Sequence, residues 1–137
     1  MIDEKDFILR EIQRLTMLIQ MLIGKVKGSN AGNIGSEANE IDQALKSEFD
    51  LSLVEIIEKS NEDLLNIVGN MNEVHIENII ELLFEINKKS KEQIGNLNLN
   101  TSELIKKNIL LIEFLDKRSN TFSMPRMNMK NTLQQWL

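Results

Sequence analysis

The stretch LTMLIQMLIG, from Leu15 to Gly24, decides the fold of this chain. Seven of its ten residues are Leu, Ile or Met, and the helical period of 3.6 distributes them over every side of a helix. A membrane-spanning helix needs about 20 apolar residues, whereas this run ends at Ile23, contains Gln20 and has charged residues in both adjoining turns. The stretch therefore predicts a helix that is covered by protein on most sides.

One face of that helix has the spacing of a coiled-coil seam. The helix is predicted over residues 3–27, with Asp3 as its cap and Gly28 as its stop. Residues spaced alternately four and three apart are expected to face the rest of the domain. They are Ile8, Ile12, Leu15, Ile19, Leu22 and Val26.

A second apolar stripe is left over on the same helix. It consists of Leu9, Met17, Leu18, Met21 and Ile23. A small domain rarely encloses one helix completely, and a large exposed apolar patch is normally an interaction site. We therefore predict that this stripe is an interface, either in a homodimer or with another protein. The alternative is binding to a membrane surface through the same helix.

Capping signals divide the rest of the chain into shorter helices. Residues 28–36 have the composition of a flexible loop, and helical hairpins are expected over residues 37–136. The signals are Ser36, the capping boxes Ser52 with Glu55 and Asn100 with Glu103, a stop at Gly69, a start at Asn72, and Ser123 followed by Pro125. The sequence predicts an all-α fold of six or seven helices in antiparallel hairpins, within a single domain of residues 1–137.

The composition excludes several classes of function. The chain has no cysteine, so disulfides, thiolate metal sites and a cysteine nucleophile are excluded. The net charge of −5 argues against general nucleic-acid binding, which needs a concentrated basic surface. The N-terminus, MIDEKD, lacks the basic region of a signal peptide. A cytoplasmic location is the expectation.

The sequence offers no convergent set of catalytic groups. The only histidine is His75, and one imidazole without a His or Cys partner does not make a metal site. It is expected to be a partly exposed residue on a helix. The glycines of GSNAGNIGS, residues 28–36, lack the strand and the Lys-Ser/Thr pair of a phosphate-binding loop. We expect no catalytic, cofactor or metal site and no enzymatic activity; an enzyme with a site built non-locally is the less favoured alternative.

The C-terminal segment differs in charge and anchoring from the middle of the chain. Residues 37–63 contain nine acids and two lysines, whereas residues 117–137 contain four basic residues and no acid. Such asymmetry can orient packing within a chain or between chains. Trp136 is expected to dock the last helix on the body of the domain. Three methionines are expected to fill gaps in the core, with an adaptable peptide-binding groove as the alternative; they are Met124, Met127 and Met129.

Four blocks of the sequence carry a resemblance to a known family. They are DFILREIQRLTMLIQMLIG (6–24), IDQALKSEFDLSLVEI (41–56), NEDLLNIVGNMNEVHIENIIELLFEIN (61–87) and ILLIEFLDKRSNTFSMPRM (109–127). In this order they resemble a family of small uncharacterised bacterial proteins related to tetratricopeptide-repeat (TPR) folds. The resemblance implies a TPR-like, protein-binding helical module with one or two hairpins rather than a repeat array, because the 34-residue repeat signature is missing. It implies no catalytic residues.

Overall fold

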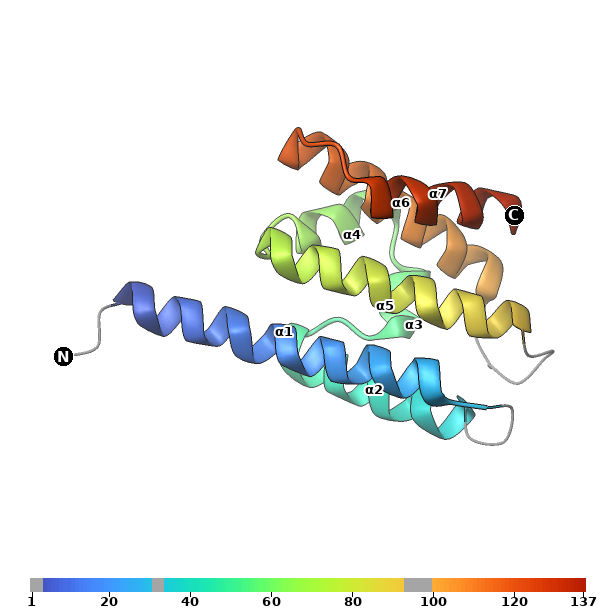
Figure 1. Cartoon of the computed structure of the whole chain (residues 1–137), viewed down its shortest axis with the longest axis horizontal. Helices are drawn as coiled ribbons and strands as arrows, with labels where there is room; N and C mark the ends of the chain where they lie inside the picture. The colour runs from blue at the N-terminus through green and yellow to red at the C-terminus, as the bar shows by residue number, and fades with distance from the viewer. Residues whose placement is uncertain (1–3, 31–33, 93–99) are drawn as a thin grey trace.

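The fold was examined in a computed structural model that describes residues 4–30, 34–92 and 100–137. Over these ranges the chain forms seven helices and no strand, which confirms the all-α prediction (Figure 1). The helices are α1 (Glu4–Gly28), α2 (Ile34–Phe49), α3 (Leu53–Glu58), α4 (Asn61–Val68), α5 (Glu73–Glu92), α6 (Thr101–Ser119) and α7 (Met124–Gln135).

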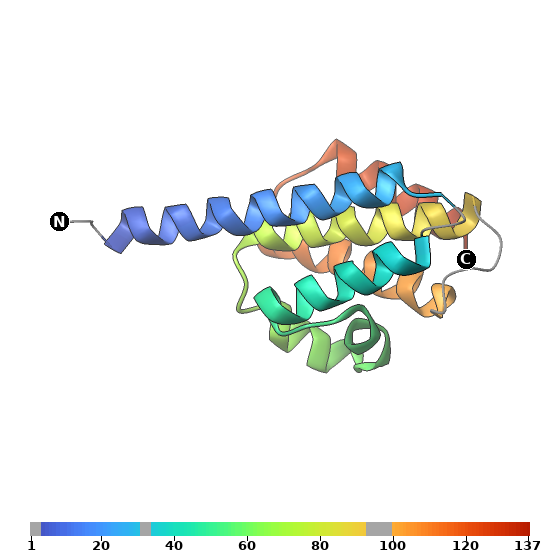
Figure 2. The ribbon, with the colours of Figure 1, turned by 90° about the horizontal axis from the view of Figure 1, so that it is seen from below.

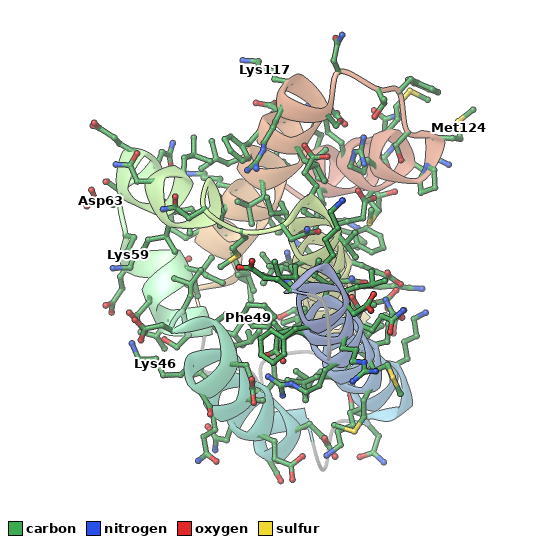
Figure 3. The ribbon with its side chains drawn as sticks, turned by 90° about the vertical axis from the view of Figure 1, so that its left-hand side faces the viewer. Lys46, Phe49, Lys59, Asp63, Lys117 and Met124 are labelled. Atoms are coloured by element: carbon green, nitrogen blue, oxygen red, sulfur yellow. The ribbon has the colours of Figure 1, made fainter. Side chains whose placement is uncertain are left out.

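The helices form two layers. α1, α5 and α7 lie beside one another in one layer, and α2, α3, α4 and α6 lie behind them (Figures 1 and 3). Three pairs of consecutive helices pack against each other: α1–α2, α5–α6 and α6–α7. The pairs are antiparallel; in α1–α2, for example, Arg14 contacts Glu48 whereas Lys25 contacts Glu40.

The most extensive helix contact, α1 with α5, joins segments far apart in the sequence. The two helices are parallel, because Ile12 lies beside His75, Gln20 beside Asn78, and the end of α1 beside Lys89. Local pattern predicts antiparallel neighbours only, so this parallel pair was missed. It buries the C-terminal half of the α1 seam completely.

The predicted caps explain where most helices begin. Ser52 and Glu55 form the complete capping box of α3, and Asn100 accepts from the backbone N–H of Glu103 at the start of α6. Ser123 caps α7, with Pro125 in its first turn. Each of these helix starts depends on residues close together in the sequence, which is why the sequence predicts them.

Two further helix ends are satisfied by side chains from other helices. Asp42 of α2 accepts a hydrogen bond from the backbone N–H of Leu53 at the start of α3, at 2.5 Å. The buried ammonium of Lys107 in α6 donates to the carbonyl oxygen of Lys59 at the end of α3, at 2.5 Å, and to Asn61 Oδ1 at 2.9 Å. These contacts orient α3 and α4 on the body, and no local signal predicts them.

An amide pair lies inside the apolar core between α5 and α6. Asn87 and Asn108 are both fully buried. Asn87 Nδ2 donates to Asn108 Oδ1 at 3.2 Å, and Asn108 Nδ2 donates to the carbonyl oxygen of Ile80 at 3.2 Å. Asn87 Oδ1 has no hydrogen-bond partner. The pair can bond only in one alignment of the two helices, so it fixes their register.

The last helix is docked as predicted, but only one of its three methionines packs against the core. Leu133 is fully buried, and the Trp136 ring stacks on Phe84 of α5 with ring centroids 5.7 Å apart. Met129 packs against the core. Met124 and Met127 are exposed, so their predicted gap-filling role is wrong.

The boundaries differ from the predicted ones at one point. α1 ends at Gly28, but α2 begins at Ile34, before the predicted cap Ser36, so the segment between the two helices is shorter than 28–36. The predicted cap Asp3 lies outside the described residues. Among those described, no helix is long and apolar enough to cross a membrane.

Candidate functional site

The N-terminal end of α1 projects beyond the helices that support it (Figure 2). α5 begins at Glu73, beside Ile12, and α2 ends at Phe49, beside Arg14. Residues 4–11 therefore extend past the ends of both partners. At 1.5 Å per residue this projecting end is about 12 Å long.

The projecting end carries three consecutive apolar residues that face solvent. Phe7 is 64 % exposed, Ile8 52 % and Leu9 53 %. Ile8 belongs to the predicted seam, but it lies on the part of α1 that extends beyond the described ends of α2 and α5, and it is exposed. The expectation that the whole seam faces the domain is therefore wrong at its N-terminal end.

The predicted interface stripe is only partly exposed. Leu9, Met17 and Met21 are exposed, with Met17 at 74 %, and Leu18 is half-buried. Ile23 is 2 % exposed and belongs to the core, so its assignment to the interface is wrong. The reason is that α1 packs against both α2 and α5, so its buried arc is wider than one seam. Ile23 lies only about 40° around the helix from the buried Ile19.

A polar clamp holds α1 where it leaves the body. His75 is buried, which corrects the expectation of partial exposure, and its Nε2 lies 3.2 Å from the carbonyl oxygen of Ile12. The Phe49 ring packs edge-on against the imidazole, with centroids 5.6 Å apart, and points from α2 toward α1 (Figure 3). The imidazole is thus occupied in positioning α1.

At the same place, an ion pair also joins α1 to α2. The Arg14 guanidinium contacts Glu11 at 2.6 Å and Glu48 at 2.9 Å. The hydrogen bond from Arg14 holds the pKa of the Glu11 carboxyl below its ordinary value. Both contacts are solvent-exposed, so they contribute orientation more than stability.

A groove runs along α5, between α1 and α7. It consists of three adjoining depressions with volumes of about 410, 310 and 320 Å³. The first and second share Glu77, and the second and third share Glu85. α5 forms the base, Thr16 and Lys27 come from α1, and α7 contributes residues including Pro125.

The base of this groove carries four glutamates, each one turn after the last. Glu73 contacts Arg118 of α6 at 3.6 Å, and Glu77 forms a hydrogen-bonded ion pair with Arg126 of α7. Glu81 lies 3.5 Å from the amide nitrogen of Gln20 in α1. The fourth, Glu85, forms no salt bridge within the described part of the chain. No sequence motif indicates this groove, because its walls come from three separate segments.

Arg126 joins α5, α6 and α7 at one end of the groove. Its buried guanidinium contacts Asp116 at 2.7 Å, Glu77 and the carbonyl oxygen of Thr121. Burial alone would lower the pKa of Arg126, but the hydrogen bond to Asp116 and the charge of Glu77 outweigh it, and the pKa is raised. The guanidinium is therefore a permanent cation.

The basic C-terminal segment is paired within the chain, but not with the acidic segment 37–63. Arg118, Arg126 and Lys130 contact acids of α5 and α6. The acids of residues 37–63 instead contact Arg14, Lys25 and Lys46. These ion pairs therefore do not join the acidic segment to the basic one, although the charge asymmetry of the sequence would allow it.

Among the described residues, no group of three or more His, Asp and Glu side chains is placed to hold a metal ion. Comparison of the chain with protein-family models, with curated proteins and with solved structures finds no match.

Proposed function

We propose that the protein is a non-catalytic interaction module that associates with a second copy of itself through the projecting end of α1. The observation that carries this proposal is the run of exposed apolar residues from Phe7 to Leu9 on a helix end without a partner helix. Covering this surface removes apolar area from water, at about 25 cal/mol per Å². Two-fold pairing is the commonest arrangement of such surfaces.

The relationship to TPR-like bacterial proteins belongs to the same proposal. It is supported by the hairpins α1–α2 and α5–α6, whose first helices lie parallel in one layer, as in stacked helix pairs. A cytoplasmic location and the lack of enzymatic activity are part of it. The lack of activity is supported by the fact that His75 is committed to the α1 clamp.

Membrane-surface binding is the weaker alternative for the projecting end. Such helices need a surplus of Lys and Arg beside the apolar face. Residues 4–11 contain three acids, Glu4, Asp6 and Glu11, and two basic residues, Lys5 and Arg10. The segment therefore lacks the cationic surplus that attracts anionic lipid. Co-sedimentation with vesicles rich in phosphatidylserine measures this alternative directly.

Sedimentation velocity over a range of concentrations tests the proposal. We expect the wild type to dimerise in the micromolar range and the variant Phe7→Glu with Ile8→Glu to be a folded monomer. Both side chains are exposed, so we expect their substitution to leave the fold intact. Phe122→Glu, at an exposed residue far along the chain, is the matched control and should dimerise like the wild type.

A wild type that is monomeric at high micromolar concentration overturns the dimer. A second variant, Met17→Glu with Met21→Glu, maps how far the contact continues along α1. If this variant dimerises normally while Phe7→Glu with Ile8→Glu does not, the contact is confined to the projecting end.

A further inference from the structure

The groove along α5 has a charge pattern that the chain itself neutralises only in part. Arg118 and Arg126 neutralise Glu73 and Glu77. Glu81 and Glu85 are half-buried at the base of the groove, and in the described chain no cation pairs with either. Partly buried carboxylates attract a cation more strongly than fully exposed ones.

The same part of the groove also offers apolar surface. The depression of about 310 Å³ between α5 and α7 is lined by Glu81 and Glu85 together with Phe84, Pro125 and Met129. Its occupant must therefore present cations and an apolar side chain on one face. A metal ion or a small cation alone would leave the apolar part uncovered.

We propose that this groove binds a basic amphipathic helix of a partner protein, with two Lys or Arg residues one turn apart opposite Glu81 and Glu85. These glutamates are four residues apart, which is about 6 Å along the axis of α5. Residues at positions i and i+4 of a second helix have the same spacing. An apolar residue between them would lie on Phe84, Pro125 and Met129.

A helical partner fits this surface better than an extended one. Extended peptides are commonly held by main-chain hydrogen bonds to the edge of a sheet, and the described residues contain no strand. A helix satisfies its own backbone and can lie along the groove between two others.

Lysines at one end of the groove limit how far the basic residues of the partner helix can extend. Lys27, Lys88 and Lys89 line the third depression, at the C-terminal end of α5, together with Glu85 and Glu92. The lysines outnumber the glutamates there, so we expect the partner's basic residues to lie in the middle of the groove. This surface is separate from the projecting end of α1, and the inference does not depend on self-association.

Selection from a displayed library of 20-residue helical peptides, randomised on one face, tests the inference on the full chain. We expect the enriched peptides to carry two Lys or Arg residues four apart with an apolar residue between them. One synthesised winner should bind in fluorescence polarisation, and its affinity should fall as salt increases.

Matched double variants locate the contact. E81Q/E85Q should weaken binding of that peptide by about tenfold or more. E58Q/E62Q removes the same charge from α3 and α4, in the other layer, and should leave the affinity unchanged. A charge swap, E81K/E85K against the peptide with glutamates in place of its basic pair, should restore binding.

Three results would overturn the inference. They are no enrichment above the starting library, enriched peptides without a basic pair, and equal weakening by E81Q/E85Q and E58Q/E62Q. Circular dichroism of each variant confirms that it is folded, and the charge swap distinguishes lost contact from lost structure.

Discussion

At the scale of single residues, the buried amide pair between α5 and α6 makes a directional prediction. Asn108→Leu leaves the Asn87 amide nitrogen without its acceptor, so we expect the free energy of unfolding to fall by about 1–3 kcal/mol. Asn87→Leu removes an amide whose oxygen is already unpartnered and leaves the bond from Asn108 to Ile80, so its effect should be smaller. Urea denaturation of both variants measures the order. The reverse order would show that the pair is not bonded as described.

The carboxyl of Glu55 provides a residue-scale prediction on pH. The hydrogen bond from Lys46, followed by that from the Ser52 backbone, lowers the pKa of Glu55 from 4.5 to about 2. Because the folded pKa is the lower one, the contribution of Glu55 to stability is present above pH 4.5 and is lost as the pH falls toward 2. A carboxyl NMR titration should find this low midpoint, and Lys46→Met should raise it. An unchanged midpoint in Lys46→Met would contradict the assigned cause.

At the scale of elements, the α1 seam should divide into two energetic halves. Ile19 is fully buried, and Ile19→Ala should lower the free energy of unfolding by about 2–5 kcal/mol. Ile8 has the same side chain and also belongs to the seam, but it lies on the projecting end, so Ile8→Ala should have little effect on the monomer. Thermal or urea denaturation at low concentration compares them. Similar losses in both would mean that the body covers the whole seam.

The C-terminal helix should be an integral part of the fold. Deletion of residues 124–137 removes the buried Leu133, the stacking of Trp136 on Phe84, and the Arg126 contacts. We expect stability to fall by about 2–5 kcal/mol, the scale of losing large buried side chains. Calorimetry of the truncated chain measures it, and an unchanged melting temperature would show that the helix is a free arm.

Local signals predicted the elements but not how they assemble. The Ser52–Glu55 box, Ser123 with Pro125 and the docking of Trp136 are local or strongly apolar features, and the structure confirms them. The parallel packing of α1 on α5 brings together two helices that are separated in the sequence by three others. No short sequence pattern encodes such a contact.

The candidate sites were predicted less completely than the elements. Leu9, Met17 and Met21 were expected to be exposed, and they are; Ile23 was misassigned because two partners widen the buried arc of α1. The groove along α5 was missed. Glutamates spaced by four residues are typical of an ordinary solvated helix face, and only the placement of α1 and α7 beside α5 makes them part of a groove.

At the scale of the whole molecule, α1 is packed unevenly along its length. This unevenness explains why its apolar stretch lies where the helix begins to contact the body. From Ile19 onward one face of the helix is buried against α2 and α5, whereas Phe7, Ile8 and Leu9 near its N-terminal end expose their apolar side chains. We propose that a second copy covers these exposed apolar residues.

The decisive measurement is hydrogen–deuterium exchange at low and at high protein concentration. If a second copy covers the projecting end, the amides of residues 4–11 exchange rapidly when the protein is dilute and become protected as concentration rises, whereas α2 exchanges equally at both. Equal exchange of residues 4–11 at both concentrations, or protection that persists in Phe7→Glu with Ile8→Glu, would contradict it.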